Sequence, residues 1–103
     1  MKINKNKHRE FIIFYGYRIR KSEILLYKCD YERDSKNFLT FNFFMKIKFK
    51  TITDNLIIPL GKENFGFAIS KINEKETTLV TLVTNKIQLF LKHMDDLLGV
   101  VND

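Results

Sequence analysis

The 103-residue chain is 45% hydrophobic and 29% charged, and it carries a net charge of +6. This size and composition exclude a wholly disordered chain and predict one globular domain, while the basic balance favours an acidic partner: nucleic acid, anionic lipid or an acidic protein surface. The one cysteine excludes an internal disulfide and, with no signal-peptide core near the start, it predicts a cytoplasmic protein without a membrane span. AT-rich coding accounts for part of the lysine excess, because Lys, Asn, Ile and Phe are all frequent.

The first half of the chain predicts strands. Residues 1–9 are polar and basic, and we expect a flexible tail there, followed by a single globular domain over residues 10–103. Aromatic and β-branched residues then alternate with other residues over positions 11–20, 24–31 and 38–50, a period-two pattern typical of strands. Residues 21–23 are short enough for a hairpin loop, and residues 32–37 form a charged loop.

Three later segments extend the predicted sheet. Residues 55–60 predict a strand at an edge, because Pro59 cannot donate a ladder hydrogen bond. Residues 62–73 fit either a strand or one helical face, and Gly66, which costs about 1 kcal/mol in a helix interior, favours the strand. Residues 77–84 are almost all Thr, Val and Leu and predict another strand.

The C-terminal segment predicts an amphipathic helix. Its apolar residues recur at helical spacing: Ile87, Phe90, Leu91, Met94, Leu97, Leu98 and Val101. Thr84 or Asn85 can cap its start, and Gly99 suits its end. Asp95 and Asp96 lie at the negative end of the helix dipole, where either neighbouring lysines offset them or they face a partner.

These elements predict an α+β fold, an antiparallel meander of five to six strands with one C-terminal amphipathic helix packed on one face. In layout it resembles pleckstrin-homology-like domains, and this resemblance implies a fold and no function. The odd-numbered apolar positions of the first three strands form the face toward the core. We expect seven residues to be buried together there: Tyr27, Phe41, Phe43, Ile47, Phe90, Leu91 and Met94.

The even-numbered positions of the same strands form a second face, half apolar and half basic. Its apolar residues are costly to expose as one patch, so they either mark a contact site or are covered in a closed barrel or a homodimer. Its cations either bind a partner or discourage edge-to-edge aggregation. The predicted binding residues are Phe14, Arg18, Arg20, Phe38, Phe44, Lys46, Lys48 and Lys50.

Residues with catalytic chemistry form no recognisable site along the chain. His8 lies in the tail, and His93 lies off the apolar stripe of the helix. Cys29 lies on the apolar face, which favours a buried thiol over a nucleophile. Three carboxylates alternate over residues 30–34, but basic neighbours weigh against a metal site. We therefore predict no catalytic residues, no metal and no cofactor.

Two functions remain open. The first is a non-enzymatic binding protein that modulates or neutralises another protein with an acidic surface, such as a bacterial toxin-immunity protein or a phage counter-defence inhibitor, through aromatic anchors ringed by charge. The second is a single-stranded nucleic-acid-binding protein in which sheet aromatics stack on bases and the cations hold phosphates.

Overall fold

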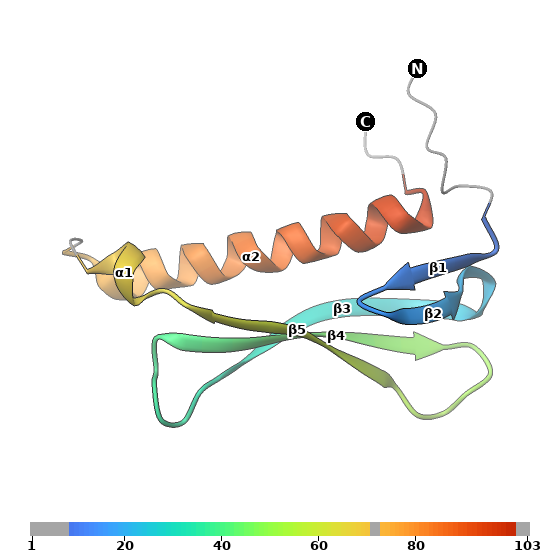
Figure 1. Cartoon of the computed structure of the whole chain (residues 1–103), viewed down its shortest axis with the longest axis horizontal. Coiled ribbons are helices and arrows are strands. Elements are labelled where there is room, and N and C mark those ends of the chain that lie inside the picture. Colours follow the sequence, from blue (N-terminus) through green and yellow to red (C-terminus); the bar gives the residue numbers. More distant parts are fainter. Residues whose placement is uncertain (1–8, 71–72, 101–103) are drawn as a thin grey trace, which may run out of the picture.

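The computed structural model describes residues 9–70 and 73–100, in an α+β fold with a long helix beside two antiparallel sheets (Figure 1). The predicted tail, apart from Arg9, lies outside the described residues, as does Val101. The elements are β1 (Phe11–Phe14), β2 (Tyr17–Arg20), the 3-10 turn η2 (Lys21–Glu23), β3 (Ile24–Arg33), β4 (Thr40–Phe49), β5 (Leu56–Asn64), α1 (Gly66–Ile69) and α2 (Lys75–Leu98). The expected five- to six-stranded meander is therefore only partly right, since the five strands divide into sheets of two and three.

The first predicted strand is a hairpin. Tyr15 and Gly16 have φ angles of 48° and 82°, so they form a tight turn that pairs β1 with β2. Alternation continues across this turn, and for that reason the sequence reads as one strand. Residues 21–23, expected as a hairpin loop, instead form η2 and carry the chain from the two-stranded sheet to the three-stranded one.

The three-stranded sheet has the order β3-β4-β5, with β4 in the centre. This confirms an edge position for the strand that contains Pro59. β5 begins near the expected start but continues to Asn64, and the predicted strand over residues 62–73 gives way to α1 from Gly66; residues 71 and 72 lie outside the described range.

Helix α2 begins at Lys75, so the prediction of a strand over residues 77–84 is wrong. The β-branched composition of that segment favours a strand, but Leu79 and Val83 are spaced by one helical turn and extend the apolar stripe of Phe90 and Met94. Burying that stripe outweighs the modest intrinsic cost of Thr and Val in a helix.

The start of α2 differs from the prediction, whereas its end agrees with it. Thr84 and Asn85 lie inside the helix rather than at its start. Gly99 ends it as expected, at a φ of 78°, while the Val100 N–H donates to the Asp95 carbonyl oxygen.

The core lies between α2, the hairpin and one face of the three-stranded sheet. The Phe43 and Phe90 rings are 5.6 Å apart, which fixes the odd positions of β4 toward the helix. Of the residues expected to be buried together, five are buried and Tyr27 and Leu91 pack partly buried against them. The hairpin contributes Ile12, Phe14 and Ile19, so for β1 the even positions face the core and the predicted odd-position face is wrong.

Candidate binding surface

From Leu26 onward the even positions of β3, like those of β4 that they face, point away from α2, because successive side chains of a strand alternate between its faces. Ile24 lies before a register shift and packs against the core. The strand register places six of these even positions, together with two β5 neighbours, in three rows across the sheet: Leu26–Lys48, Lys28–Lys46–Ile57 and Asp30–Phe44–Pro59. We call these eight residues the open face. No helix or strand among the described residues packs over it: Leu26, Lys28, Lys48, Ile57 and Pro59 are all exposed.

Apolar and basic groups alternate within the open face. Leu26 is 51% exposed and Ile57 is 54% exposed, and Phe44 is half-buried between its cross-strand neighbours Asp30 and Pro59. An aromatic ring beside the exposed Pro59, with Ile57 in the next row, is the kind of surface that anchors a partner.

The charges of the open face are unbalanced. Lys28 and Lys46 lie directly opposite each other on neighbouring strands, an arrangement that destabilises an isolated sheet. Lys48 adds a third cation in the next row, and Asp30, 4.0 Å from the Lys28 ammonium, is the one carboxylate in the three rows. An acidic group placed on this face would relieve the repulsion between the lysines.

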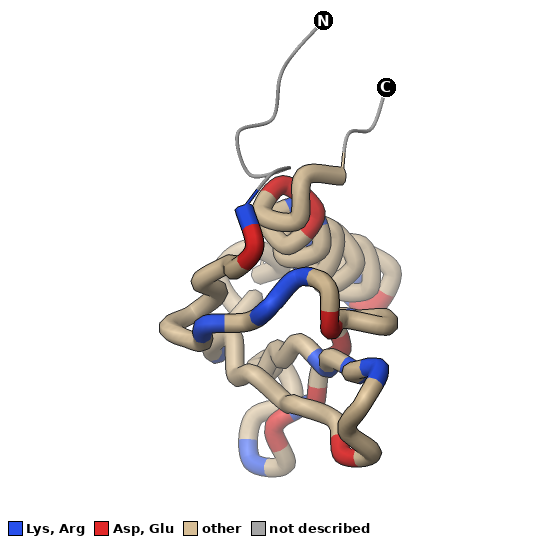
Figure 2. The backbone as a smooth tube through the Cα atoms, turned by 90° about the vertical axis from the view of Figure 1, so that its right-hand side faces the viewer, with Lys and Arg blue, Asp and Glu red and all other residues tan. Residues whose placement is uncertain are grey.

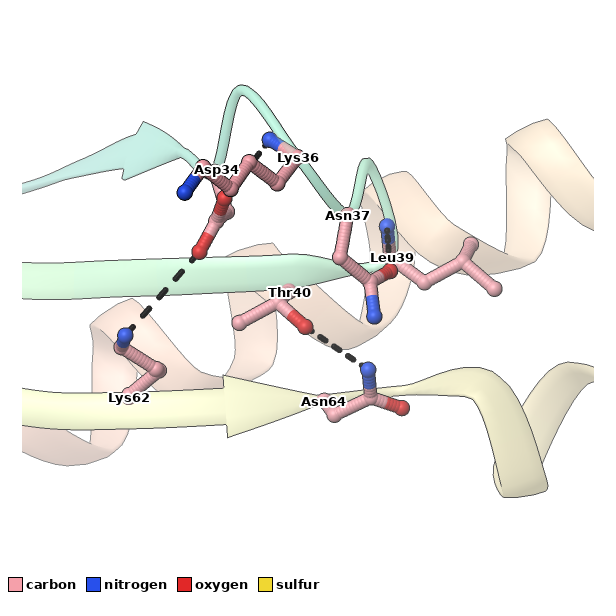
Figure 3. A network of polar contacts seen from close by, with 7 residues as sticks. All are labelled: Asp34, Lys36, Asn37, Leu39, Thr40, Lys62 and Asn64. Carbon is pink, nitrogen blue, oxygen red and sulfur yellow. Dashed lines mark hydrogen bonds and ion pairs between the residues drawn. The ribbon is translucent and has the colours of Figure 1, made fainter.

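One end of the sheet is fixed by a polar network (Figure 3). The Asn64 side-chain amide donates to the Thr40 hydroxyl at 2.7 Å. The Asn64 Oδ1 accepts from the Gly66 N–H at 2.9 Å. The Lys62 ammonium lies 3.9 Å from the Asp34 carboxylate. These contacts join the loop before β4 to the end of β5, so the open face sits on a braced sheet rather than on loops.

The structure brings together only part of the predicted binding set. Phe44, Lys46 and Lys48 share the open face as expected. Phe14 does not belong to a surface at all, since it is fully buried in the core. The prediction was wrong because β1 and β2 form a separate sheet whose even β1 positions, Ile12 and Phe14, face the core.

Arg18 and Arg20 belong to the hairpin, a different sheet from the lysines. Their guanidinium groups lie 4.1 and 4.7 Å from the centre of the Phe11 ring, and Arg20 also pairs with Glu10. Figure 2 shows that the basic positions at this end of the molecule are spread over several segments, with acidic ones between them, rather than gathered in one block.

The two remaining predicted residues lie at the ends of β4. Phe38 is 63% exposed in the loop before the strand, with its ring 5.6 Å from the Arg33 guanidinium. Lys50 follows the strand, and its N–H donates to the Glu23 carbonyl oxygen.

Residues of β5 were missed by sequence reasoning. Ile57 and Pro59 complete the rows beside Lys46 and Phe44. Residues 56–60 are apolar at every position, so periodicity could not show which side chains face the core. Only the register of β5 against β4 assigns them.

Titratable groups near the core favour their neutral forms. Burial, and then the nearby Asp30 charge, raises the pKa of the Cys29 thiol to about 11. Burial also raises the pKa of Tyr27, whose hydroxyl donates to the Asp95 carboxylate. That bond accounts for one of the two helix-end aspartates. Within residues 9–70 and 73–100 no group of His, Cys, Asp and Glu side chains is arranged to hold a metal ion.

No protein-family model matches this chain, and comparisons with curated proteins and with solved structures found no match either. The layout resemblance to pleckstrin-homology-like domains therefore gains no support from the comparisons. None of the helices in the described part of the chain is long and apolar enough to cross a membrane.

Proposed function

We propose that this chain is a non-enzymatic binding protein that engages an acidic surface of another protein through the open face of its sheet. The observation that carries the proposal is the direct opposition of Lys28 and Lys46 beside the half-buried Phe44. The pair weakens the free sheet, and a bound carboxylate turns the same charges into favourable contacts. Its neutralising role, of the toxin-immunity or counter-defence kind, belongs to this proposal.

The lysines and the aromatic ring of the open face would contribute differently to binding. Lysines at the rim of an interface increase the association rate and orient the partner, whereas a desolvated aromatic ring supplies affinity. Lys46 and Lys48 would provide steering, and Phe44 would provide the anchor. Ile57 and Pro59 would exclude water around it.

The nucleic-acid alternative loses one of its supports. Stacking of successive bases requires several exposed rings along one surface. Phe14 is buried, Phe38 lies in a loop, and Phe44 is the one aromatic residue of the open face. The experiment described next distinguishes a protein partner from nucleic acid.

The test is affinity purification from the native host, with and without nuclease, using wild type and the double variant Lys46→Glu and Lys48→Glu. The proposal predicts a protein that survives nuclease and is lost by the double variant. Lys75→Glu, a single reversal at the start of α2, is the control and should retain it. Recovery of nucleic acid alone, or of a protein that the double variant retains, would overturn the proposal.

A further inference from the structure

Strand β3 has one edge without a strand partner: among residues 9–70 and 73–100 it pairs with β4 and with no other strand. Beside the end of β3, the Asp34 N–H donates to the Thr40 carbonyl oxygen. Because hydrogen bonding alternates along an antiparallel ladder, even β3 positions bond to β4 and odd ones direct their N–H and C=O groups outward. The ten-residue strand therefore presents an edge ready for another strand.

The outward positions carry little that blocks pairing. Outside the β3–β4 ladder, the backbone groups of Tyr27, Cys29 and Arg33 make no backbone hydrogen bond within the described part of the chain. The Tyr31 N–H donates to the carboxylate of its neighbour Asp30 at 2.8 Å, a bond that closes off one donor of the edge while the chain is alone.

Apolar surface lies along the same edge. A groove of about 210 Å³ runs between the end of β3 and α2, lined in part by Tyr31, Leu79 and Val80. Tyr31 is 43% exposed and Val80 is 62% exposed, and Leu25 near the other end of β3 is 53% exposed. A strand added to this edge would cover part of this surface.

We propose that two copies of the chain pair antiparallel through β3, giving one six-stranded sheet with a two-fold axis at Cys29. A closed two-fold contact is the usual form of a homodimer. In this register Lys28 of one copy lies opposite Asp30 of the other, and the symmetry repeats the pair on the other side of the axis. Tyr27 lies opposite Tyr31 of the second copy.

Charge selects this register over its neighbours. Moving the axis by one residue to Lys28 sets two lysines face to face, and moving it to Asp30 sets two aspartates face to face, both of which destabilise a strand pair. With the axis at Cys29 no like charges are opposed anywhere along residues 25–33. The Asp30 carboxylate then turns to Lys28 of the second copy and releases the Tyr31 N–H for the new ladder.

This dimer shares Lys28 and Asp30 with the open face, but it pairs the edge of the sheet and leaves Phe44, Lys46 and Lys48 uncovered. Pairing would instead join two open faces into one continuous surface. The tests use the purified chain alone, so they succeed or fail whether or not the open face has a partner.

The first test is the mass in solution by sedimentation equilibrium over a range of concentrations. The wild type should show a concentration-dependent species at twice 12.3 kDa. Lys28→Glu or Asp30→Lys alone should weaken self-association by about tenfold or more, because each change opposes like charges twice. The double variant Lys28→Glu with Asp30→Lys should restore it, and Lys75→Glu should leave it unchanged. A monomer at every concentration, or a double variant no better than the single ones, would overturn the proposal.

The second test fixes the register by disulfide formation in a Cys29→Ser background. Lys28→Cys and Asp30→Cys chains should cross-link when mixed and oxidised, because opposed residues of an antiparallel pair bring their Cα atoms to about 4.5–5.5 Å, within disulfide range. Residue 25 lies opposite Arg33 of the second copy, so Leu25→Cys chains should not cross-link with one another. Equal cross-linking in both experiments would contradict the register. Thermal melts of each variant establish that these substitutions leave the fold intact.

Discussion

Phe43 and Phe44 are neighbours in β4 that face opposite sides of the sheet, and this contrast carries both the fold and the proposed function. Phe43 is 2% exposed and packs against Phe90 of α2. Phe44 is half-buried on the open face, between its cross-strand neighbours Asp30 and Pro59. The same side chain therefore stabilises the chain at one position and is available to a partner at the next.

Truncating Phe43 measures how much its buried ring contributes to the stability of the fold. Phe43→Ala should lower the free energy of unfolding by about 3–5 kcal/mol, because it removes a buried ring and leaves a cavity. Phe67, 93% exposed in α1, is the matched control, and Phe67→Ala should change the free energy of unfolding by less than about 0.5 kcal/mol. Chemical denaturation of both variants is the measurement. A loss below about 1 kcal/mol for Phe43→Ala would contradict the assigned core face.

At the scale of elements, helix α2 is the decisive piece of the fold. Its first turns carry Thr and Val at most positions, a composition that sequence reasoning assigns to a strand. The buried side chains at Leu79 and Val83 instead follow helical spacing and join the stripe that ends at Met94. Replacing Val80, which is 62% exposed, distinguishes the two structures.

Val80→Ala should raise the free energy of unfolding by about 0.5 kcal/mol, because alanine is the better helix former at an exposed site. In a strand the same change would lower stability, since β-branched residues are favoured there. Circular dichroism of the helix and denaturation curves for wild type and variant show whether the free energy of unfolding rises or falls. A destabilised variant with unchanged helix content would contradict the helical assignment of residues 77–84.

Some elements could be predicted from the sequence, and others depend on contacts that a linear pattern does not contain. Alternation along β4 correctly placed Phe41, Phe43 and Ile47 in the core and Phe44 outside it. The hairpin was missed because Tyr15 in the turn is not a typical turn residue. Its positive φ occurs alongside ring contacts to Phe14 and Phe90. The β5 members of the open face were hidden because only strand register assigns them.

At the scale of the whole molecule, alkaline pH should weaken the fold. The pKa of Cys29 rises from its ordinary value of 9.0 to about 11 on folding, mainly through burial, and the pKa of Tyr27 also rises. A raised pKa means that the folded chain holds these protons more tightly than the unfolded chain does. Their contribution is complete below pH 9 and is lost as pH rises toward 11 and beyond.

The free energy of unfolding of the wild type should therefore fall between about pH 9 and pH 11. The free energy of unfolding of the Cys29→Ala variant should fall less over the same interval, because the variant lacks the thiol. Urea denaturation of both proteins at a series of pH values is the measurement. Identical pH profiles for the wild type and the variant would show that folding does not perturb the thiol.

The open face as a binding surface is the central claim, and binding progress curves with the protein partner recovered by affinity purification test it most directly. Lys46→Glu with Lys48→Glu should slow association, and more at low salt than at high salt. Phe44→Ala should instead speed dissociation, by an amount worth about 2 kcal/mol if the ring is the anchor, and it should lower stability far less than Phe43→Ala does. Association and dissociation rates unchanged from wild type in both variants would contradict the claim and place the partner elsewhere on the molecule.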